Sequence, residues 1–192
     1  MTAEVARLRA EIAACRVCSA HLPLGPRPVA QFGVGARLRI TSQAPGTKVH
    51  TSGIPWTDAS GDRLRDWLAI DAATFYDPDK VAIVPMGFCY PGAVPGGGDA
   101  PPRPECAPMW HDRIAALMPA VCLTLLIGIH AQKRYLPGFT GMTEAVRRAG
   151  EHLPLFPLPH PSWRVVGWMR RNPWFEAETL PLLRARVRAA LD

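Results

Sequence analysis

The stretch Leu38-Arg-Ile-Thr-Ser-Gln-Ala-Pro-Gly46 indicates the fold, because a short apolar run passes directly into a loop that contains Pro and Gly. Residues 81–84 and 121–127 form two further apolar runs with the length of buried parallel strands. Segments with helical spacing lie between and around these runs. They are residues 3–14, 62–70, 104–118, 129–136 and 174–191. Alternating strands and helices predict an α/β protein with a doubly wound or three-layer α/β/α sheet.

Two loops carry most of the candidate functional residues. A sheet of this kind places its site at the carboxyl ends of its strands. Residues 42–56 follow the first strand, and residues 158–164 follow another apolar segment, residues 153–158. We therefore expect these two loops to meet at one edge of the sheet.

Four of the five cysteines are spaced as ligands of a metal centre. Cys15 and Cys18 form a Cys-x-x-Cys pair, whereas Cys89 and Cys106 are single residues on either side of a Pro/Gly-rich loop. Thiolates bind iron–sulfur clusters and zinc, so the spacing predicts one centre held by all four. Unrelated buried thiols are the alternative, and a chain of this length needs no disulfide framework. Cys122 is interpreted as an ordinary strand residue.

The composition is that of a globular protein with a basic surface. The chain has 192 residues and 48% hydrophobic residues, which predicts a single α/β domain across residues 1–192. Its net charge of +6 suits a polyanion such as nucleic acid, although only three of the 22 basic residues are Lys, and such arginine usage is also typical of a GC-rich genome. Because neither a signal-like start nor a long apolar run occurs, we expect a soluble, cytoplasmic monomer with no membrane partner.

Several short motifs occur in an informative order. Ser42-Gln-Ala-Pro-Gly46, Gly53-Ile-Pro-Trp56 followed by Ala59-Ser-Gly61, and His160-Pro-Ser162 resemble the motifs of the uracil-DNA glycosylase superfamily. The cysteine spacing resembles that of its iron–sulfur branch, the family 4 and 5 enzymes. Each motif alone is weak, but together they extend over residues 15–164 and favour membership.

The resemblance implies a fold, a cofactor and a reaction. The implied fold is three-layer α/β/α, with a central, mainly parallel four-stranded sheet. The implied cofactor is a structural [4Fe-4S] cluster on Cys15, Cys18, Cys89 and Cys106, with zinc as the less favoured occupant. The implied reaction is hydrolysis of the N-glycosidic bond of uracil extruded from DNA, which leaves an abasic site for base excision repair. No lyase step is expected, so the enzyme would be monofunctional.

The same resemblance assigns roles to individual residues. His160 corresponds to the side chain that donates a hydrogen bond to the uracil oxygen where negative charge develops. Trp56 corresponds to the aromatic residue that stacks on uracil, with an ordinary core position as the alternative. Ser162 and Arg164 fall where the family contacts the minor groove or a phosphate. The uracil and its flanking phosphate are expected to contact the backbone of the first motif at Gln43, Ala44, Pro45 and Gly46.

The chain departs from the family at the position of the carboxylate that acts on water. Family 4 has Glu where this chain has Gln43, and an amide cannot act as a general base. His50 is the only titratable base near this position in sequence, so we predict that it positions or deprotonates the water, with an ordinary surface position as the alternative. Asp58 is a further candidate acid, with a helix N-cap as its alternative role.

A second departure affects base recognition. The uracil-reading Asn of the family is replaced by Pro85, and we expect the backbone of Met86 and Gly87 to read the base instead. Three alternatives remain open at this point. The chain could be a glycosylase for another deaminated base, a non-catalytic module that binds damaged or single-stranded DNA, or a zinc-stabilised α/β protein unrelated to DNA.

Overall fold

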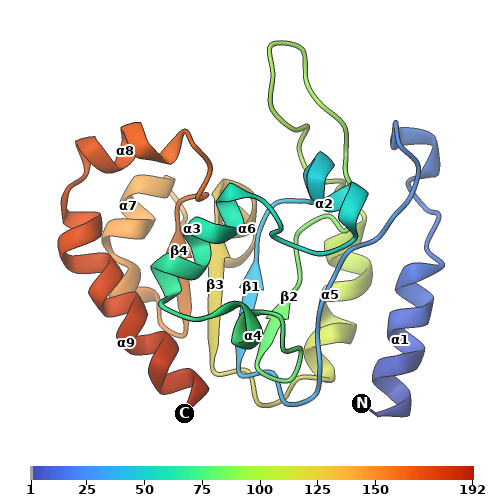
Figure 1. Ribbon diagram of the computed structural model, residues 1–192, viewed down its shortest axis with the longest axis horizontal. Helices are drawn as coiled ribbons and strands as arrows, with labels where there is room; N and C mark the ends of the chain where they lie inside the picture. The colour runs from blue at the N-terminus through green and yellow to red at the C-terminus, as the bar shows by residue number, and fades with distance from the viewer. Residues whose placement is uncertain (1) are drawn as a thin grey trace.

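The computed structural model describes residues 2–192 and is built around one sheet (Figure 1). Its four strands have the order β2-β1-β3-β4, and every pair of neighbours is parallel. The strands are β1 (Leu38–Thr41), β2 (Val81–Ile83), β3 (Leu123–Ile127) and β4 (Leu155–Leu158). The predicted mainly parallel, four-stranded sheet is therefore confirmed.

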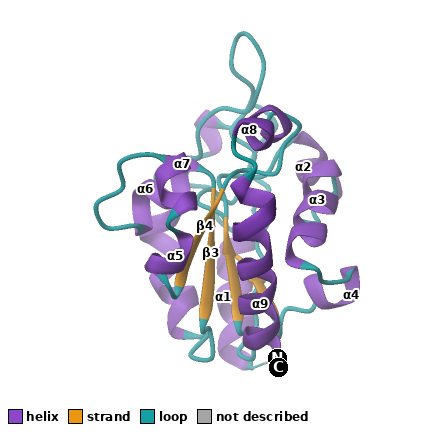
Figure 2. Cartoon of the chain, turned by 90° about the vertical axis from the view of Figure 1, so that its left-hand side faces the viewer, coloured by secondary structure: helices purple, strands orange, loops and turns teal. Residues whose placement is uncertain are grey.

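Helices cover both faces of this sheet, which makes three layers (Figure 2). One face packs against α3 (Ala59–Leu68), α4 (Ala72–Phe75) and α9 (Leu180–Leu191) through alternate strand residues such as Leu38 and Ile40. The other face packs against α1 (Ala3–Ala13), α5 (Cys106–Ala116) and α6 (Ile129–Tyr135) through residues such as Ala82 and Leu126. Both faces are thus buried, which agrees with the mainly apolar character of the strands. Within residues 2–192, no helix is both long and apolar enough to span a bilayer.

The remaining helical segments are short, and most were not predicted. They are α2 (Thr47–Ser52), α7 (Met142–Arg147), α8 (Val165–Arg171), the 3₁₀ turns Ser19–His21 and Ala149–His152, and a π-helical turn, Phe175–Thr179. The π-helical turn takes up the first part of the helix that was predicted over residues 174–191, and α9 takes up the rest. Helix α2 lies inside the segment predicted to be a loop, residues 42–56. Helices this short depend on tertiary packing, so their residue spacing carries little signal.

The prediction that Cys122 is an ordinary strand residue is wrong. Strand β3 begins at Leu123, so Cys122 lies just outside the sheet and its side chain is exposed. Its backbone N–H donates to the Arg37 carbonyl, at 2.9 Å. The apolar run 121–127 extends past the strand because a hydrophobic pattern does not mark where the ladder ends.

The carboxyl ends of the strands are tied together beyond the regular ladder. The N–H groups of Met86 and Gly87 donate to the carbonyls of Ser42 (2.7 Å) and Gln43 (2.9 Å). On the other side, the buried Gln132 amide donates to the Leu126 and Leu158 carbonyls, which join the ends of β3 and β4. The loops that leave this edge therefore start from fixed positions.

Candidate functional site

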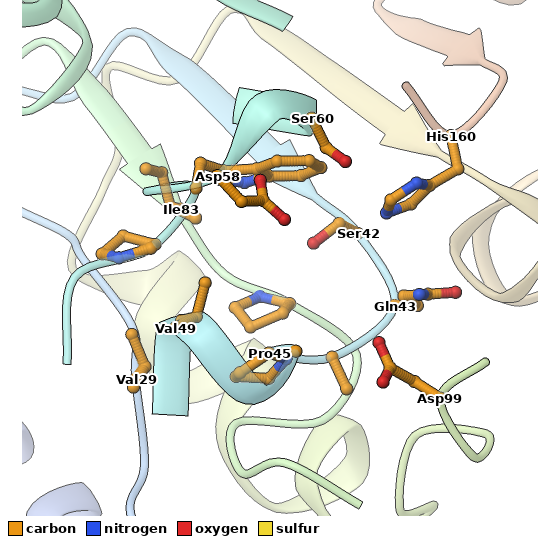
Figure 3. A pocket seen from close by; sticks show the side chains of 15 residues that line it. Val29, Ser42, Gln43, Pro45, Val49, Asp58, Ser60, Ile83, Asp99 and His160 are labelled. Atoms are coloured by element: carbon orange, nitrogen blue, oxygen red, sulfur yellow. The ribbon is translucent and has the colours of Figure 1, made fainter. Parts of the chain in front are cut away.

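A cleft lies at the carboxyl edge of the sheet and gathers residues from distant parts of the chain (Figure 3). Its polar lining consists of Ser42, Gln43, Asp58, Ser60, Asp99 and His160. Its less polar lining consists of Val29, Ala44, Pro45, Gly46, Val49, Pro55, Trp56, Ile83 and Pro85. The predicted meeting of the 42–56 and 158–164 loops is confirmed.

His160 and Trp56 form the aromatic part of this cleft. Their rings are stacked, with centroids 5.5 Å apart and an interplanar angle of 28°. Burial lowers the pKa of His160 to about 4, an effect that nearby Asp58 partly opposes. The imidazole is therefore neutral at pH 7 and keeps one N–H group as a hydrogen-bond donor. In Figure 3 its ring points toward the Ser42 hydroxyl.

The backbone of Trp56 is held in an unusual conformation. Its φ of 58° lies in the left-handed region, which non-glycine residues seldom adopt. The Trp56 carbonyl accepts hydrogen bonds from Arg65 Nη1 (3.3 Å) and from the Tyr76 hydroxyl (3.2 Å). A Cβ atom at Gly61 would lie 1.9 Å from the same carbonyl oxygen. Glycine at position 61 therefore lets helix α3 approach Trp56 closely and fix its ring in the cleft.

The loop that carries His160 is held by a side chain that sequence reasoning missed. Arg63, on α3, donates from Nη1 to the carbonyls of Pro161 (2.9 Å) and Ser162 (3.0 Å). Ser162 and Arg164 do not line the cleft. Arg164 instead places its guanidinium 4.6 Å from the ring of Trp163, whose side chain is 73% exposed. This Trp–Arg pair projects from the rim toward solvent.

The structure places His50 away from the cleft. Val49 lines the cleft, and the next residue on α2 is turned by about 100° around the helix axis. The His50 ring instead lies 6.1 Å from that of Tyr90, and its Nδ1 is buried without a hydrogen-bond partner. The prediction that His50 acts on the water does not match this geometry, because its ring faces another part of the fold.

Two carboxylates do line the cleft. Asp58 is the N-cap of α3, and its Oδ1 accepts from the Gly61 N–H at 3.0 Å. Asp99 comes from the loop between the last two cysteines of the set, and sequence reasoning missed it. Asp99 follows three glycines in a long loop, and no sequence pattern there connects it with the first motif. Partial burial, together with the charge of Asp58, raises the pKa of Asp99.

The segment expected to read the base does not present the predicted residues to the cleft. Pro85 lines the cleft, whereas Met86 and Gly87 do not. Both of their N–H groups donate to the carbonyls of Ser42 and Gln43, so neither N–H is free to contact a base. The backbone bonds that fix the cleft floor are therefore the reason why this prediction does not match the geometry.

A buried histidine holds this segment from behind. His111 Nε2–H donates to the Pro85 carbonyl at 2.9 Å, which leaves Nδ1 to accept from Arg39 (3.0 Å) and from the Tyr135 hydroxyl. The His111 ring is nearly parallel to the rings of Phe88 and Tyr135, and each centroid lies 5.9 Å away. Burial and the charge of Arg39 lower the pKa of His111 to about 4, so the imidazole is neutral in the folded protein.

The four cysteines of the predicted metal centre surround a second cavity. Cys15, Cys18, Cys89 and Cys106 all line it, together with apolar side chains such as Ile12, Leu22, Phe88 and Trp110. Burial and the neighbouring thiols raise the pKa values of Cys89 and Cys106 to about 11. Within residues 2–192, however, no three potential ligands are close enough together to hold one ion. The four-thiolate donor set and its apolar surroundings fit a thiolate-bound metal centre.

Comparison with known families agrees with the fold. The family model described as Uracil DNA glycosylase superfamily matches residues 30–184. This range contains the whole sheet and every cleft-lining residue except Val29. It leaves Cys15 and Cys18 outside, so the match carries no information about that part of the cysteine set.

Proposed function

The chain belongs to the uracil DNA glycosylase superfamily, and from that premise we propose that it is a monofunctional glycosylase that removes uracil from DNA. In this reaction an extruded deoxyuridine enters the cleft, and water replaces uracil at C1′ of the sugar. The products are free uracil and an abasic site. The observation that carries the proposal is the neutral, buried His160 stacked on Trp56 at the carboxyl edge of the sheet.

His160 would stabilise the departing base. As the glycosidic bond breaks, negative charge develops on the base and positive charge on the sugar. A neutral imidazole can donate a hydrogen bond to the uracil oxygen that gains the charge. Its low pKa keeps it in this donor form throughout the physiological pH range, and burial makes the hydrogen bond stronger than it would be in water.

The cleft also offers contacts for binding and recognition. Trp56 presents an indole beside the space that a pyrimidine would occupy, and stacking offsets part of the cost of extrusion. Among the cleft-lining residues of the described chain, 2–192, Gln43 alone has a side-chain amide, which offers both a donor and an acceptor to the edge of the base. The exposed Trp163–Arg164 pair would contact the bases and phosphates around the extruded nucleotide. The net charge of +6 would attract the DNA backbone as a whole.

We also propose that Cys15, Cys18, Cys89 and Cys106 hold a [4Fe-4S] cluster, as in the family 4 and 5 enzymes. Support comes from the shared cavity, its apolar wall and the four-thiolate donor set. The cluster would join α1, the Cys89 loop and the start of α5, and so would have a structural role. Anaerobically purified protein should show broad absorbance near roughly 400 nm and about four iron atoms per chain. Stoichiometric zinc without iron would contradict this assignment.

The decisive experiment is a single-turnover assay with a labelled oligonucleotide that contains one uracil. Alkaline treatment after the reaction converts each abasic site into a strand break. An oligonucleotide with thymine or cytosine at the same position provides the control. Breaks at uracil alone would support the proposal. Failure to cleave, with the cluster intact and DNA still bound, would instead favour a DNA-binding module of the same fold or a glycosylase for another deaminated base.

A further inference from the structure

A hairpin beside the cleft places one carboxylate next to the first motif. It is the light-green loop that projects from the top of Figure 1. Its two arms pair through an antiparallel bridge between Ala93 and Asp99, and Ala100 N–H donates to the Gly92 carbonyl at 2.8 Å. Three glycines at the tip, residues 96–98, have φ values of 88°, 93° and 104°, which reverse the chain. The pairing fixes where Asp99 stands relative to the cleft.

The carboxylate of Asp99 reaches toward the position where family 4 has Glu. A Cβ atom at Gly46 would lie 3.4 Å from Asp99 Oδ2, which places this oxygen beside the first motif. In Figure 3 the Asp99 carboxylate points from its own loop toward Gln43. Although the residue as a whole is exposed on the hairpin, its carboxylate end lines the cleft. The cleft thus regains, from another loop, the acidic group that Gln43 lacks.

The carboxylate of Asp99 has fewer contacts within the protein than the other candidate general bases, Asp58 and His50. Asp58 uses Oδ1 to cap α3, and the ring of His50 lies against Tyr90 instead of the cleft. The structure shows neither a hydrogen bond nor an ion pair for the Asp99 side chain among the contacts of residues 2–192. Both of its oxygens therefore remain available to a water molecule.

We propose that Asp99 is the general base that activates the hydrolytic water, an inference that rests on the proposed glycosylase function. The water oxygen bonds to C1′ while the bond from C1′ to N1 of uracil breaks, and the electron pair leaves with the base. Asp99 accepts the proton that the water loses. It then releases this proton to the uracil anion, which restores the carboxylate. His160 meanwhile donates its hydrogen bond to the departing base.

The titratable groups around Asp99 support this role. Those that share the cleft with it are Asp58, at the start of α3, and His160, on the loop after β4. Partial burial and the charge of Asp58 raise the pKa of Asp99, which brings its basicity closer to neutral pH, where a general base is most effective. His160 stays neutral above about pH 4 and adds no positive charge.

The test compares Asp99→Asn with the wild-type protein in the uracil excision assay. Asparagine preserves size and polarity but cannot take a proton, so we expect the single-turnover rate to fall about 100-fold or more. The wild-type rate should decline as pH falls through the pKa of Asp99, and the variant should lose this acidic limb. Affinity for an oligonucleotide with a tetrahydrofuran abasic-site analogue should be unchanged or slightly higher. The matched control is Asp66→Asn, an exposed carboxylate on α3, which should cleave at the wild-type rate.

The outcomes separate this inference from the proposed function. An active wild-type protein whose Asp99→Asn variant cleaves normally, or keeps the acidic limb, would overturn the role of Asp99 and leave the glycosylase proposal intact. If Asp58→Asn lost the acidic limb while Asp99→Asn kept it, the base would be Asp58. A wild-type protein that binds the oligonucleotides but never releases uracil would overturn the glycosylase proposal and, with it, this role.

Discussion

Acidification should destabilise the fold through His111, by an amount that follows from its pKa. This side chain is 2% exposed, and its folded-state pKa is about 4, whereas an unfolded histidine titrates near pH 6.5. The unfolded chain therefore binds a proton that the folded protein excludes. The resulting stability is complete above the unfolded pKa and is lost as pH falls from about 6.5 to about 4. Between pH 7 and pH 5 the loss amounts to about 2 kcal/mol.

Urea unfolding at a series of pH values measures this effect. His111→Gln keeps a polar side chain but removes the titrating group, so its free energy of unfolding should be lower at pH 7 and should change less with pH. The difference between wild type and variant should shrink by about 2 kcal/mol from pH 7 to pH 5. His152→Gln, in the Ala149–His152 turn, is the control and should keep the full wild-type slope. A His111→Gln variant with the same pH dependence as wild type would refute the reasoning.

Three further predictions concern the cleft and the cysteine cavity. Replacing His160 with Ala removes the donor to the departing base, so single-turnover excision should slow by roughly two orders of magnitude while DNA binding persists. In Gly61→Ala the new Cβ would lie 1.9 Å from the Trp56 carbonyl oxygen, so urea unfolding should show a loss of about 1–3 kcal/mol. Cys89→Ser should lose the absorbance near roughly 400 nm, whereas Cys122→Ser should retain it, because Cys122 lies outside the cavity.

Each of these three outcomes has a result that would contradict it. Near-wild-type cleavage by His160→Ala would remove this residue from the mechanism. For Gly61→Ala the control is Gly141→Ala, since a Cβ at position 141 meets nothing within 4 Å. Equal stability of the two variants would show that the close approach at Gly61 carries no cost. Full iron content in Cys89→Ser would mean that Cys89 is not a ligand.

The order of elements and most of the cleft could be predicted from the sequence. Short apolar runs separated by helical patterns indicate a parallel sheet, because a strand buried on both faces is mainly apolar. The first motif and His160 follow two of these runs directly, so a parallel sheet brings them to the same edge. Helices α2, α7 and α8 were missed, since segments of six or seven residues are stabilised mainly by their neighbours.

The amino-acid sequence by itself determined the α/β class, the shared edge where the motifs meet and the set of four cysteines, because these depend on local pattern and spacing. Only the tertiary structure decided which side chains enter the cleft. Helix α2 is oriented so that Val49 lines the cleft and His50 does not. The Met86 and Gly87 N–H groups donate to backbone carbonyls and so cannot bind a base. Asp99 enters from a hairpin with no sequence link to the first motif. Such contacts join segments that pack together only in the folded chain, so no local pattern records them.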